Sequence, residues 1–264
     1  MLKVYFTRQD LARTRVAEGA DPLWETVLSL QRLRESPTEP ALAAWRRHVV
    51  RHGPGPLRTL IPLVPRHGYF PDFLTPYAAV HGVEPGLEAV MSTPKERLRK
   101  ELTMLAAQQP LPAWVADIAD GEPAAMRHLA RSLRTYHHQA IAPGWPRVAA
   151  SVGGDRALRL HALGQSGAEA MLRTFGPAMR WRPPVLEVGY PVARELRLEG
   201  RGLLFVPSYF CTDPIALADD TLPPVLVYPA SAPAKAAGPR FRTYGSEALR
   251  GVQIRIGARV RNGA

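Results

Sequence analysis

The sequence predicts an α+β fold with a mainly helical body and a small β layer near residues 184–229. Two patterns carry this prediction. Apolar residues recur at helical spacing in several segments up to about residue 180, and short β-rich runs bounded by turn residues follow them. The composition agrees, since 46% of the 264 residues are hydrophobic and 22% are charged. Such a balance is typical of a folded chain rather than a disordered one.

The first expected elements are a short strand and two helices. Residues 2–7 alternate weakly in polarity, as a strand does. Asp21 and Pro22 predict a helix start, because aspartate caps helices well and proline suits the first helical position. A second helix is expected over residues 41–52. Residues 57–82 are rich in proline and aromatic residues, and we expect them to form an ordered connector that packs on the core.

The middle of the chain is expected to be helical. Thr93 and Glu96 have the spacing of a capping box, which predicts a helix start there. Further helices are expected over residues 110–119, 122–140, 148–163 and 166–175. The pattern then changes, and strand-like runs separated by proline and glycine occupy residues 185–188, 196–198, 203–206 and 225–228.

The positive charge is concentrated at the C-terminal end. The chain has 34 Lys and Arg against 23 Asp and Glu, a net charge of +11. Residues 230–264 hold seven basic residues and one acidic residue, so they carry +6 and leave +5 for the first 229 residues. A basic segment favours phosphate-bearing partners. We expect this tail to be poorly ordered, and its candidate DNA contacts are Arg240, Arg242, Arg250, Arg255, Arg259 and Arg261.

Several protein classes are disfavoured by what the chain contains. Cys211 is its only cysteine, so neither an internal disulfide nor a zinc site of four cysteines can form. No apolar run reaches the roughly 18–20 residues that cross a bilayer. The N-terminus carries charges where a signal peptide needs an apolar stretch. We therefore expect a cytoplasmic protein with no membrane partner.

Two histidine pairs are candidates for chemistry. His48 and His52 lie four residues apart on an expected helix, a spacing that can bring two imidazoles to one metal ion. The arginines around them favour a solvated basic face instead, and we expect no metal. His137 and His138 follow Tyr136, and either a pocket or a helix end that favours histidine accounts for them. A candidate ligand pocket comprises Tyr136, His137, Trp145 and Cys211.

The sequence lacks three common enzyme motifs. No phosphate-binding loop, dinucleotide fingerprint or serine nucleophile elbow occurs. Cys211 follows a tyrosine and a phenylalanine and is interpreted as a buried apolar residue rather than an activated thiol. We therefore expect neither an enzyme nor a cofactor. If the chain were an enzyme, the residues to mutate would be His137, His138, Glu187 and Cys211.

Seven blocks of sequence are similar to those of one protein family. They are residues 6–17, 71–76, 136–137, 142–147, 181–188, 200–211 and 222–229. In these blocks the chain resembles the N-terminal region of actinobacterial ArsR-like, winged-helix transcriptional regulators. The resemblance spans roughly residues 2–229. It implies a regulator, with DNA directly or through a full-length relative as partner. A small-molecule effector, a homo-oligomer and control of an antibiotic resistance or biosynthesis gene are further expectations.

The resemblance ends before the DNA-binding module. In this family a C-terminal winged helix-turn-helix binds DNA, and the N-terminal region has no settled biochemical role. Residues 230–264 show no pair of helices joined by a short turn, as a recognition unit needs. Three explanations are open: a natural truncation, a frameshift, or a diverged basic arm. We favour the first two. The alternative function is a ligand-binding or dimerisation module that does not bind DNA.

Overall fold

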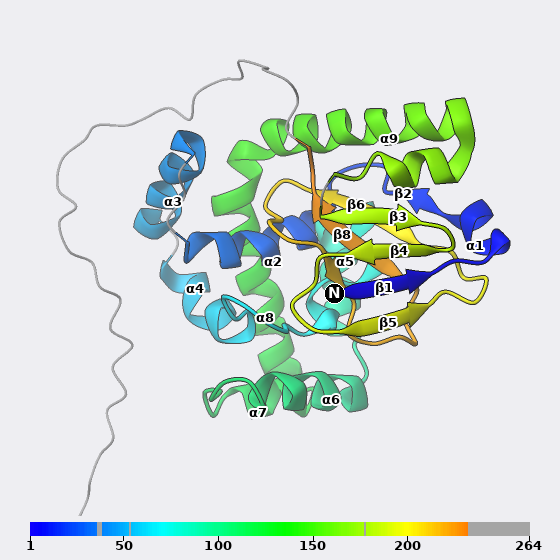
Figure 1. Ribbon diagram of the computed structural model, residues 1–264. Helices are drawn as coiled ribbons and strands as arrows, with labels where there is room; N and C mark the ends of the chain where they lie inside the picture. The colour runs from blue at the N-terminus through cyan, green and yellow to red at the C-terminus, as the bar shows by residue number, and fades with distance from the viewer. Residues whose placement is uncertain (36–38, 53, 177, 232–264) are drawn as a thin grey trace, which may run out of the picture.

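The computed structural model describes residues 1–35, 39–52, 54–176 and 178–231. Helices form one body and strands form two four-stranded sheets, so the α+β prediction is confirmed. The β layer differs from the prediction in two respects. It consists of two sheets rather than one, and each sheet takes one strand from the N-terminus of the chain. Figure 1 shows the helices beside both sheets.

The helical body is built around α2. Its longer helices are α2 (Pro22–Leu33), α3 (Pro40–His52), α4 (Pro54–Leu60), α5 (Val83–Met91), α6 (Lys95–Ala106), α7 (Val115–Ala119) and α8 (Pro123–Tyr136). Three short 3₁₀ turns, η1 (Ile61–Leu63), η2 (Asp72–Leu74) and η3 (Tyr77–His81), connect α4 to α5. The expected connector over residues 57–82 therefore contains the end of a helix and these turns.

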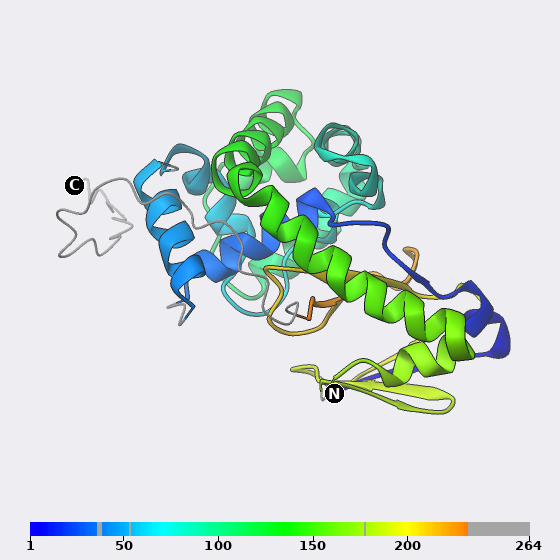
Figure 2. The same ribbon diagram turned by 90° about the horizontal axis from the view of Figure 1, so that it is seen from above.

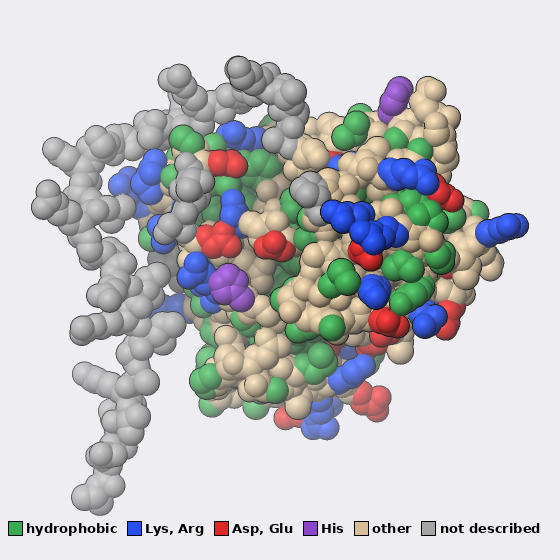
Figure 3. All heavy atoms as spheres, viewed as in Figure 1, with side chains coloured by type: hydrophobic (Ala, Val, Ile, Leu, Met, Phe, Trp, Pro, Cys, Tyr) green, Lys and Arg blue, Asp and Glu red, His purple; other side chains and the backbone are tan. Residues whose placement is uncertain are grey.

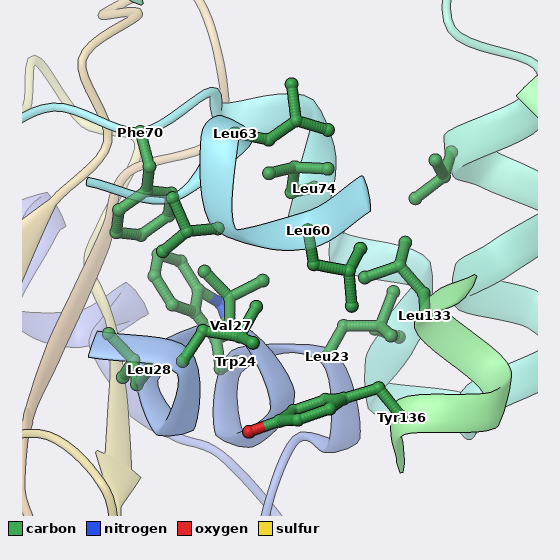
Figure 4. Close-up of a cluster of buried hydrophobic side chains, with 14 of the residues drawn as sticks. Leu23, Trp24, Val27, Leu28, Leu60, Leu63, Phe70, Leu74, Leu133 and Tyr136 are labelled. Atoms are coloured by element: carbon green, nitrogen blue, oxygen red, sulfur yellow. The ribbon is translucent and has the colours of Figure 1, made fainter. Parts of the chain in front are cut away.

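Helix α2 begins as the sequence predicts. The Oδ1 atom of Asp21 accepts hydrogen bonds from the amides of Leu23 at 2.9 Å and Trp24 at 3.0 Å, and Pro22 is the first helical residue. Nearly the whole helix is buried, so it is the centre of the body rather than a surface helix. Figure 4 shows Leu23, Trp24 and their neighbours packed against residues of α4, η2 and α8.

Each sheet combines one strand from the N-terminus with three strands from the C-terminal part of the described chain. Sheet A has the order β3 (Met179–Arg182), β4 (Val185–Val188), β1 (Leu2–Tyr5) and β5 (Arg194–Arg197). Sheet B has the order β2 (Arg15–Val16), β6 (Leu204–Ser208), β8 (Val225–Pro229) and β7 (Ile215–Ala216). The first strand thus lies between two strands of the C-terminal half, antiparallel to β4 and parallel to β5. Short helix α1 (Arg8–Arg13) connects β1 to β2.

The body, sheet B and sheet A form three successive layers. Val206 and Val227 of sheet B point into the core of the helical body, whereas Phe205 and Leu226 point into a second core. Leu2 and Val4 on the inner face of sheet A fill that second core. This alternation is the two-residue period of a strand, so sheet B can be covered on both faces. Figure 2, seen from above, shows the body and sheet A on opposite sides.

Helix α9 (Trp145–Arg173) connects the body to sheet A. It starts beside the body and runs along the two sheets, as Figures 1 and 2 show. The helix is interrupted at Ser166 and Gly167, where Gly167 has a φ of 78°. The sequence predicts two helices here, over residues 148–163 and 166–175, whereas the structure places the interruption at Ser166 and Gly167, inside the second of them. After the break the chain turns back, and Met171 and Leu172 enter the second core.

Three expected element bounds are wrong. The Thr93 hydroxyl donates to the carbonyl oxygen of Ala89 instead of capping α6, whose N-cap is Pro94. The end of α5 lies next to Thr93 and supplies this acceptor, so no capping box forms. Of the residues 110–119 expected to be helical, only those of α7 form an α-helix. The helix expected over residues 122–140 ends at Tyr136 and continues as a π turn, η4 (His137–Ile141).

Candidate functional site

A buried polar seam joins α2 to the end of α8. The Ser29 hydroxyl donates to the carbonyl oxygen of Thr26 at 2.7 Å, so its oxygen accepts the hydrogen of the Tyr136 hydroxyl at 2.9 Å. Tyr136 and Ser29 have no exposed surface. Burial raises the pKa of Tyr136 well above its ordinary value, so the phenol stays neutral. The seam lies at the point where α8 changes into the π turn.

His137 is the first residue of that π turn. The Thr26 hydroxyl donates to the carbonyl oxygen of Pro22 at 2.6 Å, and Nδ1 of His137 lies 3.0 Å from the same hydroxyl oxygen. We therefore assign the proton to Nδ1, which donates to Thr26. Burial lowers the pKa of His137 to about 4, and the charge of His138 acts in the same direction. A neutral imidazole with so low a pKa is a weak base near neutral pH.

The candidate pocket residues are only partly brought together. The rings of His137 and Trp145 approach to 5.8 Å at 63°, and Tyr136 is the neighbour of His137. Cys211 lies in the same hydrophobic core, where its thiol donates to the carbonyl oxygen of Asp213 at 3.0 Å. The hollows found in the described residues lie elsewhere, at the ends of α9 and β3 and beside residues 217–225. The pocket therefore stays a prediction.

Cys211 has the environment of a structural residue. Its side chain is buried, and burial raises the pKa of the thiol well above its ordinary value. A thiolate would be needed for nucleophilic attack or metal binding, and this environment disfavours it. The interpretation of Cys211 as a buried apolar residue is confirmed. Trp24, Trp45 and Trp181 are also buried, as expected of core residues.

Four buried carboxylates fix the loops that flank sheet B. Asp10 accepts from the amide of Gly202, and Glu25 accepts from residues 208–210. Asp72 accepts from the amides of residues 218 and 219, and Asp155 accepts from the Tyr228 hydroxyl and the Ser231 amide. Each carboxylate comes from the part of the chain before β3. These contacts therefore attach the C-terminal strands to the rest of the molecule.

Glu25 has no exposed surface and three hydrogen-bond donors. Its Oε2 atom accepts from the Ser208 hydroxyl at 2.9 Å and from the Phe210 amide at 3.1 Å. Its Oε1 atom accepts from the Tyr209 amide at 2.9 Å. Burial raises the pKa of Glu25 to about 7, although these donors and their preference for the charged form oppose that shift. The three donors belong to the end of β6 and the two residues after it, so the Glu25 carboxylate fixes the chain where β6 ends.

Asp155 belongs to a charged cluster inside the second core. It forms an ion pair with Arg159 at 2.7 Å, and both side chains are almost completely buried. Arg159 also donates to the carbonyl oxygen of Thr174 at 2.6 Å and to the Ser231 hydroxyl at 3.2 Å. Its guanidinium lies 4.5 Å from the centre of the Phe175 ring. The cluster thus connects α9 to the last described residue.

Several candidate residues cannot be assessed or do not form a site. Arg240, Arg242, Arg250, Arg255, Arg259 and Arg261 lie outside the described residues, so their role in DNA binding stays a prediction. His48 lies on α3, as expected. Among the described residues, no group of three or more His, Cys, Asp or Glu side chains could hold a metal ion. Glu187 lies on the outer face of sheet A and pairs with Arg182 at 3.3 Å.

Comparison with known proteins provides no further assignment. No family model matches the chain, and no curated protein or solved structure matches it either. Within the described part of the chain, none of the helices has both the length and the apolar character that crossing a bilayer requires.

Proposed function

We propose that this chain is a cytoplasmic transcriptional regulator and that residues 1–229 are its effector-responsive and oligomerising part. The proposal starts from the blocks of sequence that resemble ArsR-like regulators. A small-molecule effector and DNA are the partners proposed with it, and an antibiotic resistance or biosynthesis gene is the proposed target. The catalytic role considered for His137, His138, Glu187 and Cys211 forms no part of this proposal.

The observation that supports this proposal most is the position of the resembling blocks in the fold. Asp10, Asp72 and Ser208 all lie in such blocks, and all three take part in the carboxylate contacts around sheet B. Tyr136 lies in another block and bonds to α2. The blocks are therefore parts of one framework rather than scattered matches.

The proposed DNA contact is the basic tail. Arginine suits this role because its planar fork can donate two hydrogen bonds to a phosphate. The test is a binding titration over a series of salt concentrations, first with a random pool of duplexes and then with any enriched sequence. Each phosphate contact contributes about 0.9 to the slope of log K against log salt. A steep slope together with an enriched sequence supports a regulator, whereas a slope without enrichment contradicts it.

The matched variants separate the tail from the body. Replacing Arg240, Arg242, Arg250, Arg255, Arg259 and Arg261 by glutamine should lower the slope by up to about 5 if all six contact phosphates. The control replaces Arg127 and Arg131, two exposed arginines of α8, by glutamine. An unchanged slope in the tail variant, or an equal loss in the control, would assign the phosphate contacts elsewhere.

The second candidate is a ligand-binding or dimerisation module that does not bind DNA. It is favoured by the described residues themselves, which contain two hydrophobic cores and four carboxylate contacts that join the body to the C-terminal strands. Such a chain could form mixed dimers with a full-length relative. Analytical ultracentrifugation with and without duplex DNA distinguishes the two: a dimer that binds no DNA at any salt concentration supports the module and excludes direct regulation.

A further inference from the structure

The segment between β6 and β7, residues 209–214, is held to the helical body through one side chain. We call this segment the strap. Within the described chain, the hydrogen bonds that join the strap to another element are those that the amides of Tyr209 and Phe210 donate to Glu25. The other hydrogen bonds of the strap stay within residues 208–213. Glu25 therefore controls the polar attachment of the strap to α2.

The carboxylate of Glu25 has no basic partner. On the face of the molecule shown in Figure 3, acidic side chains lie among basic ones at the surface. Glu25 instead lies four residues after Asp21 at the start of α2, and both side chains are almost completely buried. Within the described residues neither of them forms an ion pair. Burial without a cation and the nearby carboxylate both disfavour the charged form of Glu25, in agreement with its raised pKa of about 7.

The titratable and charged groups around Glu25 do not compensate its charge. They are Asp21 on α2, Tyr209, Cys211 and Asp213 on the strap, His137 on η4, and Arg32, Glu39 and Arg147, whose charges act on Tyr209. Near neutral pH both His137 and Cys211 are neutral, since burial lowers the pKa of the imidazole to about 4 and raises that of the thiol. Arg32 pairs with Glu35. The remaining titratable residues of the elements packed on α2 are exposed, namely Tyr77, His81, Glu84, Glu88 and His138.

The chain beyond β7 is attached differently. There Asp72 accepts from the amides of residues 218 and 219. Lys100 pairs with the Asp219 carboxylate at 2.9 Å, so this attachment includes a cation. Burial and the charge of Glu101 raise the pKa of Asp72 to about 6, which is below that of Glu25. Near neutral pH this end therefore already carries its charges, and it can stay attached while the Glu25 end changes.

Proton release changes what Glu25 contributes to the closed strap. The neutral acid can donate its hydrogen to the Ser208 oxygen and still accept from the Tyr209 amide, so it holds the strap without a buried charge. The carboxylate ion meets the same donors but is removed from water, and it regains water when the strap moves away. We propose that the strap is a pH-controlled segment that stays closed, with Cys211 buried, while Glu25 holds its proton and opens when Glu25 releases that proton to solvent.

The direction and size of the effect follow from proton linkage. In the closed state the pKa of Glu25 is about 7, and in the open state it returns toward the ordinary value of 4.5. The closed state thus holds a proton that the open state has released, so closure weakens as the pH rises from 4.5 to 7. Between pH 6 and pH 8 the opening equilibrium should rise about tenfold. The open state stays a minor one, because the Phe210 ring packs against the Trp45 ring at 4.9 Å when the strap is closed.

Cys211 reports the opening directly, because it is buried in the strap and is the only cysteine of the chain. Its labelling by N-ethylmaleimide is measured in the full chain at pH 6, 7 and 8. Each rate is divided by the rate of the urea-unfolded chain at the same pH, which removes the intrinsic pH dependence of the thiol. We expect this labelling ratio to rise about tenfold from pH 6 to pH 8.

Two further measurements separate local opening from global unfolding. The labelling ratio should hardly change on addition of about 1 M urea, since opening the strap exposes little surface. Hydrogen exchange of the amides in residues 209–214, corrected for its intrinsic pH dependence, should also speed up between pH 6 and pH 8. Exchange of the β1 amides should not follow it, because β1 lies in sheet A.

Three variants assign the effect to Glu25. Glu25→Gln resembles the neutral acid and cannot titrate, so its labelling ratio should change less than about twofold between pH 6 and pH 8. Its poorer hydrogen bonding should raise labelling at both pH values alike. Glu88→Gln, at an exposed position of α5, is the matched control and should keep the tenfold rise of the parent. Asp72→Asn should keep that rise as well, since it alters the attachment beyond β7.

Three results would overturn the inference. They are a labelling ratio in the parent that stays constant from pH 6 to pH 8, the same rise in Glu25→Gln as in the parent, and a rise that depends on urea as steeply as global unfolding does. If Glu25→Gln does not fold, the pH and urea series of the parent decide together with hydrogen exchange. None of these measurements involves DNA, so the proposed function is tested separately.

Discussion

The carboxylate of Glu25 accepts a hydrogen bond from the hydroxyl of Ser208, although 183 residues separate them in the chain. Glu25 lies on α2, the central helix of the body. Ser208 is the last residue of β6, which pairs with β8 at the centre of sheet B. The same carboxylate accepts from the amides of Tyr209 and Phe210. A helix residue therefore satisfies the backbone of a loop that would otherwise be buried without partners. The body and sheet B are joined here by a polar contact inside an apolar core.

Replacing Glu25 by glutamine should destabilise the protein. The amide keeps one oxygen acceptor but directs an NH₂ group toward backbone donors, so at least one buried N–H loses its partner. The expected loss in the free energy of unfolding is about 1–3 kcal/mol. Urea unfolding measures it, and Glu88→Gln, at an exposed position of α5, is the control, with an expected change within about 0.5 kcal/mol. Equal stability of both variants would contradict the role assigned to Glu25.

Asp21 makes stability depend on pH. Burial raises its pKa to about 7 from an ordinary value of 3.8, so the folded protein holds a proton that the unfolded chain has released. Its favourable contribution is complete below about pH 3.8 and is lost as the pH rises through 7. Asparagine caps helices as well as aspartate does and does not titrate. Asp21→Asn should therefore reduce the loss of melting temperature between pH 4 and 8 and raise the melting temperature at pH 8. The part of the loss that comes from Glu25 and Asp72, whose pKa values burial raises to about 7 and about 6, should remain.

The control for Asp21→Asn is the behaviour of His137. Burial lowers the pKa of His137 to about 4, so its contribution is present above its ordinary value of 6.5 and is lost as the pH falls through 4. His137→Gln should weaken that acid-side loss and leave the slope above pH 7 unchanged. If Asp21→Asn had the same pH profile as the parent, the assignment of the alkaline-side loss to Asp21 would be wrong.

These residues show which parts of the molecule could be predicted from sequence. The start of α2 was predictable because Asp21 and Pro22 act on the next few residues. The role of Glu25 was not, since a charged residue in a helix is expected at the surface and its three partners lie far along the chain. The same limit applies to β1, whose alternation is visible although its partners β4 and β5 are not. Tyr136 and His137 stand out as candidates, but Ser29 and Thr26 do not.

The pair of Tyr136 and Ser29 should be energetically coupled. Tyr136→Phe removes the donor and leaves the Ser29 hydroxyl bound to the Thr26 carbonyl oxygen alone. A double-mutant cycle with Ser29→Ala measures the pair directly. We expect a coupling energy of about 0.5–1.5 kcal/mol, as for other neutral hydrogen bonds. A coupling indistinguishable from zero would contradict a stabilising hydrogen bond between the two hydroxyls.

Two glycines should respond in opposite ways to alanine. Gly202 has a φ of 74°, its amide donates to Asp10 at 2.9 Å, and a Cβ there would lie 2.7 Å from the carbonyl oxygen of Arg13. Gly202→Ala combines backbone strain with this clash and should cost about 2 kcal/mol or more. Gly153 lies inside α9, where an added Cβ meets nothing within 4 Å. Gly153→Ala should stabilise the protein by about 1 kcal/mol, because alanine favours a helix more than glycine does.

Thermal and urea unfolding of both alanine variants, measured side by side, test this contrast. The loss in Gly202→Ala should be accompanied by weaker protection of the Gly202 amide against hydrogen exchange, since Asp10 holds that amide. The gain in Gly153→Ala should leave that protection unchanged or stronger. If Gly202→Ala were as stable as the parent, the contact between Asp10 and the loop before β6 would contribute little. The attachment of β2 to β6 would then depend on their strand pairing and on the hydrogen bond that Arg13 donates to the carbonyl oxygen of Gly200.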